Sequence, residues 1–183
     1  LGSNILANDL LLLGGMALLL VGLGFKVAAA PFHSWAPDVY EGSPSPMVAY
    51  MASGVKTAGF AGIIRVFVFG FESYRVEWQP LVYAVAVATL LVGAVVAVSQ
   101  TNVTRMLAYS SISHAGFILL GVQAATDKGV QAALFYLATY SLTVIGAFGV
   151  VTVVGRRGDN AHDLTDYRGL ARRAPLLAFA FLV

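Results

Sequence analysis

Residues 22–56 read GLGFKVAAAPFHSWAPDVYEGSPSPMVAYMASGVK and decide the fold, because they place a helix break between two apolar runs. Each run carries one lysine, Lys26 before the break and Lys56 after it. An ammonium group in a bilayer core costs several kcal/mol unless it is paired, hydrated or neutralised. The stretch therefore predicts two neighbouring membrane helices that meet at a charged site inside the membrane, a pattern that favours ion movement.

The composition of the chain is that of a membrane protein. Of its 183 residues, 58% are hydrophobic and 11% are charged, and the mean hydropathy is +0.80. A soluble domain carries about 25% charged residues, so lipid or other helices must surround most of this chain. The net charge of +2 is too small to indicate nucleic acid. The absence of cysteine excludes disulfides, thiolate metal sites and iron–sulfur clusters within the sequence.

Apolar segments fill most of the chain, and they predict a single all-α, multi-pass transmembrane domain over residues 1–183. The first segment, residues 10–32, should break near Pro31, because proline removes a backbone donor and clashes with the preceding turn. The other expected spans are 47–69, 81–98, 105–122, 130–154 and a truncated 175–183. Since the chain lacks an initial Met and ends inside an apolar run, we expect an internal piece of a larger protein.

The basic residues between the apolar segments predict the orientation of the bundle, because cytoplasmic loops are enriched in lysine and arginine. One side of the predicted bundle holds Arg65, Arg75 and Lys128. The other side, which we expect to be cytoplasmic, holds Arg105, Arg156, Arg157, Arg168, Arg172 and Arg173.

The two lysines are the main candidates for chemistry. Lys56 lies about ten residues from the nearest turn, or about 15 Å at 1.5 Å per residue, which is close to the middle of a bilayer. Lys26 is nearer to the break, so its head group either reaches the interface or stays inside if the helix continues. Two ammonium groups about 8 Å apart repel by roughly 2 kcal/mol at an effective dielectric constant of about 20. Protonation of one lysine therefore helps to deprotonate the other. No carboxylate lies within a spanning segment, so a counter-ion for Lys26 has to come from outside this sequence.

Two histidines are further candidates for moving protons, because histidine titrates near physiological pH. His114 lies in the middle of an apolar run, with Ser110 and Ser111 one turn earlier on the same face. It is either a relay group or a neutral histidine bonded to a neighbouring helix. His33 follows Pro31, where it either relays protons or caps exposed carbonyl groups.

A polar stripe and a pair of carboxylates complete the set. Tyr136, Thr139, Tyr140 and Thr143 share one helix face, which either packs against another helix or forms a candidate hydrated face. Packing is the commoner role of such residues in membranes. Asp38 and Glu41 lie in the turn after the break, where we expect a capping or solvated role.

Three stretches resemble one known family. They are KVAAAPFHSWAPDVYEGSPSPMVAYMASGVK, SQTNVTRMLAYSSISHAGF and the DYRGL loop. Together they look like the antiporter-like membrane subunits of proton-pumping NADH–quinone oxidoreductase (respiratory complex I), and most of all like the subunit N branch. The resemblance covers nearly the whole chain, and the PFHxWxPDVYxGxP run is highly specific. It implies an antiporter-like helix bundle with a broken helix, built from inverted repeats. The chain would supply the seventh to eleventh helices and the start of the twelfth.

The resemblance also implies roles for matching residues. Lys26 would correspond to the lysine on the broken helix and Lys56 to the bridging lysine on the next one. His114 would correspond to the histidine of the tenth helix, and His33 to the one after the break. The family also uses a glutamate on its fifth helix, paired with the first lysine, and a lysine on its twelfth helix. Neither position lies in this sequence.

The function that the resemblance implies is proton translocation coupled to electron transport from NADH to quinone, as a subunit of a translocase in the respiratory chain. The location would be the cell inner membrane or an equivalent energy-transducing membrane. The chain would hold no redox centre, and NADH, FMN, iron–sulfur clusters and quinone would bind to partner subunits. Its partners would be other membrane subunits, homologous antiporter-like ones among them, and lipid.

Two alternatives stay open. One is a subunit of a multi-subunit cation/proton antiporter. Sodium-dependent exchange without NADH or quinone would favour this alternative. The other is a structural scaffold subunit without a proton path of its own, in which the lysines would be spectators.

Overall fold

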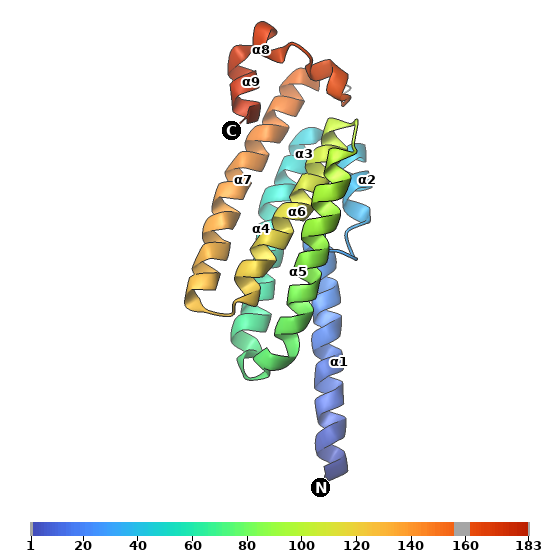
Figure 1. Cartoon of the computed structure of the whole chain (residues 1–183), viewed down its shortest axis with the longest axis vertical. Coiled ribbons are helices and arrows are strands. Elements are labelled where there is room, and N and C mark those ends of the chain that lie inside the picture. Colours follow the sequence, from blue (N-terminus) through green and yellow to red (C-terminus); the bar gives the residue numbers. More distant parts are fainter. Residues whose placement is uncertain (1, 156–161, 183) are drawn as a thin grey trace.

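The computed structural model describes the backbone of residues 2–155 and 162–182, with side chains from residue 10 onward. Within these ranges the elements are helices, accompanied by one isolated β-bridge. Five helices are long and apolar enough to cross a membrane, which confirms the all-helical, multi-pass architecture. The helices lie side by side in a bundle, and the first half of α1 (Gly2–Val27) projects beyond it (Figure 1).

The membrane helices follow one another with short connections. The second span is a continuous helical rod made of α3 (Ser45–Tyr50), the π-helix η1 (Met51–Val55), α4 (Lys56–Ile63) and the π-helix η2 (Ile64–Gly70). The later spans are α5 (Arg75–Val98), α6 (Val103–Gln123) and α7 (Asp127–Gly155). The shorter elements are α2 (Trp35–Gly42), η3 (Glu72–Tyr74), η4 (Leu164–Tyr167), α8 (Leu170–Arg173) and α9 (Pro175–Leu182).

The helix break begins one turn before Pro31. Ala28 adopts the left-handed conformation, with a φ of 58°, which few residues other than glycine adopt. Its amide donates to Phe25 O at 3.1 Å, and the next amide, of Ala29, donates to Gly24 O at 2.8 Å. These are the two bonds of a Schellman motif, which ends a helix by satisfying its last carbonyl groups. The chain then turns and resumes as α2.

Helix α5 begins at Arg75, earlier than the expected span 81–98, so the polar residues before that span are helical and not a connecting loop. Their side chains find partners at the end of α6. Arg75 Nη2 donates to Ala124 O at 2.9 Å, and Gln79 Nε2 donates to Gln123 O at 2.6 Å. The side chains of Arg75 and Gln79 thus have hydrogen-bond partners at the end of α6. Polar residues can therefore form the first turns of α5.

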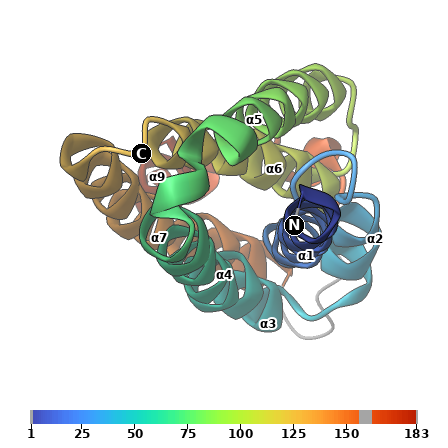
Figure 2. The same cartoon turned by 90° about the horizontal axis from the view of Figure 1, so that it is seen from below.

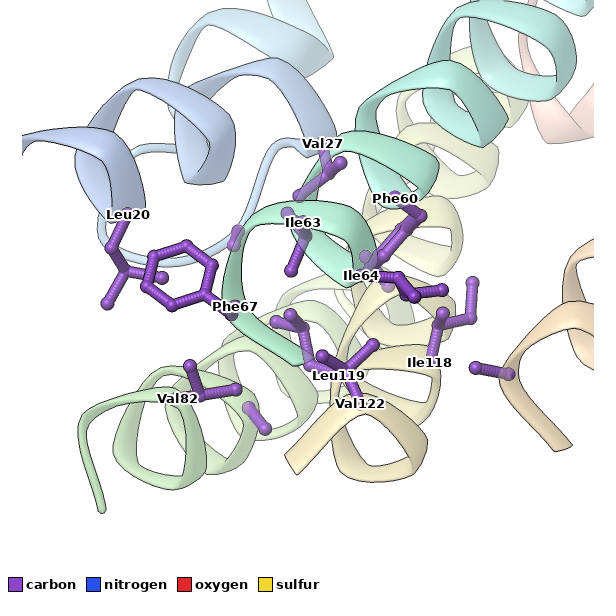
Figure 3. Close-up of a cluster of buried hydrophobic side chains, with 14 of the residues drawn as sticks. Leu20, Val27, Phe60, Ile63, Ile64, Phe67, Val82, Ile118, Leu119 and Val122 are labelled. Carbon is purple, nitrogen blue, oxygen red and sulfur yellow. The ribbon is translucent and has the colours of Figure 1, made fainter. Parts of the chain in front are cut away.

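Apolar side chains from α1, α4, η2, α5, α6 and α7 form the main core (Figure 3). Its central members are Phe60, Ile63, Phe67, Val82, Ile118, Leu119 and Val122. A second cluster joins α2 and α3 to α6 and α7. Lipid competes for apolar surface, so close packing and not the hydrophobic effect holds such helices together. Viewed along the bundle, α1 and α2 lie at one edge and the start of α7 lies at the opposite edge (Figure 2).

Residues 162–164 lie against the start of α6. The Val103 amide donates to His162 O at 2.6 Å, and the Leu164 amide donates to Thr101 O at 3.0 Å. The start of α6 and α8 therefore share one end of the bundle, and the α4–α5 and α6–α7 turns lie at the other (Figure 1). The first end carries Arg105, Arg168, Arg172 and Arg173, and the second carries Arg75 and Lys128. Arg156 and Arg157, expected with the first group, lie outside the described residues.

Helices α5 and α6 approach each other closely at two glycines. A Cβ atom on Gly93 would lie 2.7 Å from Ser113 Cα, and one on Gly116 would lie 2.7 Å from Leu90 Cγ. Small residues at such positions let two backbones come together. The two backbones of α5 and α6 are therefore in close contact at both glycines.

Replacing Gly93 with alanine is expected to lower the thermal unfolding midpoint of the detergent-solubilised protein. The new methyl group would overlap the α6 backbone, and overpacking of this kind costs about 1–3 kcal/mol. Gly146→Ala is the matched control, because a Cβ atom there meets nothing within 4 Å in the described chain. Equal midpoints for the two variants would contradict the close contact of α5 with α6.

Candidate functional site

Lys56 is a buried lysine in the middle of the bundle, with 3% of its surface exposed. It opens α4 directly after the π-helical segment η1, and single π-helical turns recur at functional sites. Its ammonium group donates to Ser111 O at 2.7 Å and also to Ser111 Oγ. Within the described ranges no carboxylate pairs with it. A backbone carbonyl and a hydroxyl group of α6 therefore take the place of a counter-ion.

Ser111 is the meeting point of three helices. Besides Lys56 from the second span, the hydroxyl groups of Tyr40 in α2 and Tyr140 in α7 approach its side chain. Tyr140 Oη is buried and makes no hydrogen bond of regular geometry. The Lys56 ammonium lies 5.8 Å from the centre of the Tyr140 ring, within the range of a cation–π interaction.

His114 continues this cluster one turn further along α6. Its Nδ1 atom lies 2.8 Å from the hydroxyl group of Tyr136, and its ring centre lies 5.0 Å from that of Tyr140. Lys56 and His114 are close enough to interact electrostatically. Lys56, Ser111, Tyr140, His114 and Tyr136 thus form a row of neighbouring polar side chains from α4 across α6 to α7, hydrogen-bonded at its two ends, which we call the polar line below.

A pocket of ≈ 240 Å³ opens beside the end of the polar line. Its lining residues are His114, Tyr136, Thr139, Tyr140 and Thr143. The two threonines are exposed, and their hydroxyl groups donate to carbonyl groups of α7 itself. The stripe expected from the sequence is therefore divided, because its tyrosines contact His114 whereas its threonines face the open side. At about 30 Å³ for each water molecule, the pocket has room for several.

Lys26 lies in the last turn of α1, and its side chain is exposed. It forms no ion pair with any residue that the structure describes. Its aliphatic stem packs on α4, since a Cβ atom on Gly59 would lie 3.3 Å from Lys26 Cγ and 2.7 Å from Val27 Cγ1. Gly59 is one turn after Lys56, so the two lysines belong to facing helices, and α1 packs on the turn of α4 that follows Lys56.

The helix break is held by side chains that the sequence analysis did not select. Trp35 Nε1 donates to Phe25 O at 2.9 Å. The buried amide of Ala30 donates to Thr89 Oγ1, on α5, at 2.9 Å. His33 lies in the same turn, and its Nδ1 atom is buried without a hydrogen-bond partner in the described chain.

Asp38 and Glu41 are ion-paired, and not merely solvated or capping as the sequence analysis expected. Arg105 Nη1 lies 2.7 Å from an oxygen of each carboxylate, and Asn102 Nδ2 donates to Glu41 Oε1 at 3.1 Å. Exposed pairs of this kind contribute about 0–1 kcal/mol each. Their role is to fix the direction of α2 against the start of α6.

The residues that sequence reasoning missed are the partners of the candidates and not the candidates themselves. Ser111 carried a signal, because it precedes His114 by one turn in a run of serines. Thr89 and Gly59 sit in apolar helices, where threonine and glycine are ordinary packing residues. Arg105 was assigned only to the basic side of the bundle.

Comparison with known proteins places the chain in a family. The chain belongs to the family described as NADH:quinone oxidoreductase/Mrp antiporter, TM, whose model matches residues 2–183. This membership confirms the resemblance noted in the sequence. Together with the five apolar helices, it makes the chain a multi-pass membrane protein.

Among its relatives, a protein of Parafrankia sp. (strain EAN1pec) named NADH-quinone oxidoreductase subunit N is 50% identical over 96% of this chain. A chain of respiratory complex I from Thermus thermophilus is 43% identical, with a TM-score of 0.75 over 91% of this chain and 35% of its own length. A chain of the Mrp complex from Dietzia sp. DQ12-45-1b is 28% identical, with a TM-score of 0.83 over 91% of this chain and 31% of its own length. The chain spans about a third of the curated relatives that it matches, 34% in the Parafrankia protein.

Replacing Gly59 with alanine is expected to push the end of α1 away from α4, since the new methyl group would meet Val27 Cγ1 and the stem of Lys26. The expected cost is about 1–3 kcal/mol, measured as a lower thermal unfolding midpoint. Gly62→Ala is the matched control on the same helix, because a Cβ atom there lies 3.3 Å from one flexible Leu23 methyl group. If Gly59→Ala unfolded at the same temperature as Gly62→Ala, the close approach of the two lysine-bearing helices would be wrong.

Proposed function

We propose that the chain forms part of a proton-translocation path in a membrane subunit of NADH–quinone oxidoreductase, respiratory complex I. The observation that carries the proposal is the buried ammonium group of Lys56, which has no carboxylate partner in the described chain and lies at one end of the polar line. Intramembrane ionisable residues that face the interior of a bundle are typical of ion pathways. The names of the relatives at 50% and 43% identity support the same function.

The first step is proton release from Lys56 toward Ser111. The Lys56 ammonium already donates to Ser111 Oγ. A hydroxyl group is both donor and acceptor, so Ser111 can accept this proton while it releases its own toward Tyr140. Lys56 becomes a neutral amine, and no charge remains on the serine. The Ser111 carbonyl keeps the amine in place throughout, because it is a second acceptor for the same nitrogen.

The second step carries the proton to His114. Tyr140 Oη accepts the proton that Ser111 releases and gives up its own, which reaches His114 through water in the pocket that both side chains line. His114 takes up the proton as imidazolium and exchanges it with Tyr136 or with water in the adjoining pocket. In this role Thr139 and Thr143 border the hydrated face of the path.

Lys26 is the proton-binding residue that precedes Lys56 in the proposed path. Because the two ammonium groups lie on facing helices and repel each other, a proton arriving on Lys26 favours proton release from Lys56. Lys26 is exposed in the described chain, so its counter-ion is a carboxylate of another segment or subunit. His33, whose buried Nδ1 has no partner, is the further candidate for a proton carrier at the break.

The complete assembly supplies the driving reaction. Partner subunits bind NADH, FMN, iron–sulfur clusters and quinone, and this chain contributes no redox centre. Its neighbours are other membrane subunits, homologous antiporter-like ones among them. The location is the inner membrane or an equivalent energy-transducing membrane, with the end that carries Arg105 and α8 in the cytoplasm, as the positive-inside rule predicts.

Replacing Lys56 with methionine in the full-length subunit is expected to lower the rate of NADH-driven proton pumping at least about tenfold. A tenfold lower rate corresponds to an activation free energy that is higher by about 1.4 kcal/mol. Methionine keeps most of the apolar stem and removes the charge. Pumping is measured in membrane vesicles, after a native gel has shown that the complex assembles. Lys128→Met, at an exposed position in the first turn of α7, is the control and should pump normally. Normal pumping by an assembled Lys56→Met complex would instead favour a scaffold.

The second candidate function is a subunit of a cation/proton antiporter. The observation that favours it is the TM-score of 0.83 to a chain of the Mrp complex. The two functions differ in what drives transport. Vesicles with the full-length protein should acidify on addition of NADH, whereas an antiporter would move protons when a sodium gradient alone is applied.

A further inference from the structure

A hydrogen bond connects the helix break to α5, whose apolar part carries no charged residue. The amide of Ala30 lies inside the protein, 2% exposed, and donates to Thr89 Oγ1 at 2.9 Å. Thr89 is fully buried, and its own hydroxyl hydrogen goes to Val85 O one turn earlier in α5. The Thr89 hydroxyl group thus makes two hydrogen bonds: its oxygen accepts from the Ala30 amide, and its hydrogen is donated to Val85 O.

The other hydrogen bonds of the break stay within α1, the break itself and the start of α2. The amides of Ala28 and Ala29 bond back to α1, and the Phe32 amide donates to Ala29 O at 2.7 Å. The carbonyl group of Phe25 accepts from Trp35 as well. Among the hydrogen bonds of the described break, the bond from Ala30 is therefore the one that reaches a different membrane helix.

The same face of α5 that carries Thr89 also meets α6. Gly93 is one turn after Thr89, and the α6 backbone at Ser113 presses against it so closely that a Cβ atom would overlap. Ser113 lies between Ser111 and His114 on α6. A single face of α5 thus connects the break, next to Lys26, with the part of α6 that holds Lys56.

We propose that Thr89 is a positioning residue that fixes the Lys26-bearing end of α1 relative to Lys56. The inference rests on the proposed proton path. Thr89 exchanges no proton itself, because its hydroxyl hydrogen is held by Val85 O. Without its oxygen, a buried amide loses its partner in a region without water, which is costly. The end of α1 then shifts to find another acceptor, and the spacing of the two lysines changes.

The test compares Thr89→Val with Thr89→Ser in the full-length subunit. Valine has nearly the shape of threonine without the hydroxyl group, and serine keeps the hydroxyl group. The measured quantity is the number of protons pumped per NADH oxidised by the assembled complex in vesicles. Thr89→Val is expected to lower this ratio about twofold or more, in the range reported for changes within coupled elements. Thr89→Ser should restore most of it.

The ratio separates positioning from general stability. A purely structural defect lowers the amount of assembled complex and its NADH oxidation together, and it leaves protons per NADH unchanged. Thr152→Val is the matched control, because Thr152 makes the same bond to its own helix, to Phe148 O at 2.8 Å. This control should keep the normal ratio.

Three outcomes decide the inference. A normal ratio for an assembled Thr89→Val complex, with pumping lost in Lys56→Met, would overturn the role of Thr89 and leave the proton path standing. Normal pumping in Lys56→Met would overturn the path itself. If Thr89→Val does not assemble, Thr89→Cys replaces it, because a thiol is a weaker acceptor than a hydroxyl group. An intermediate ratio would then support the inference, and a normal ratio would overturn it.

Discussion

The hydrogen bonds from Lys56 to Ser111 are the interaction on which the rest of the structure depends. A charged amine inside a membrane bundle must be satisfied by the protein, because no bulk water is available to it. Here the acceptors are the carbonyl and the hydroxyl of one residue on another helix. Such an arrangement demands a fixed rotation and depth for both helices. The tight contacts at Gly59 and Gly93 supply that precision by locking each helix against its neighbour.

Helix α6 acts as the common axis of these contacts. Near its start, Arg105 binds the two carboxylates of α2. Two turns later Ser111 holds Lys56 of α4, and one turn further His114 bonds to Tyr136 of α7. At Gly116, the backbone of α5 approaches α6 closely. One helix therefore contacts α4 and α7, which carry Lys56 and Tyr136, as well as α2 and α5. A shift in α6 would change several of these separations together, as a proton path of the kind proposed would require.

Much of the fold and part of the site could be predicted from the sequence. The apolar runs predicted the membrane helices, and Pro31 marked the break, although the helix ends earlier because the geometry at Ala28 satisfies its last carbonyl groups. The distance of Lys56 from the nearest turn predicted a position near the middle of the bilayer, and the structure buries its side chain inside the bundle. Intrinsic properties of the residues decide all of these features.

What the sequence could not predict depends on how one helix is rotated against another. Thr89 has the sequence context of a threonine that bonds to its own helix, and it does so, but its second bond exists only because the break lies beside it. Ser111 is one of several adjacent serines, and only the packing of α6 selects it as the partner of Lys56. The π-helical segments likewise left no mark in the apolar pattern, since a single inserted residue does not change its composition.

The central claim is that the polar line acts as one path and not as a set of separate contacts. A double-mutant cycle with Ser111→Ala and Tyr136→Phe, at two points along that line, tests it most directly through protons pumped per NADH. Residues that act independently give losses that add within about 0.3–0.5 kcal/mol in free energy. We predict a double variant that is little worse than the poorer single variant, because one broken link already interrupts the path. Fully additive losses would contradict the account.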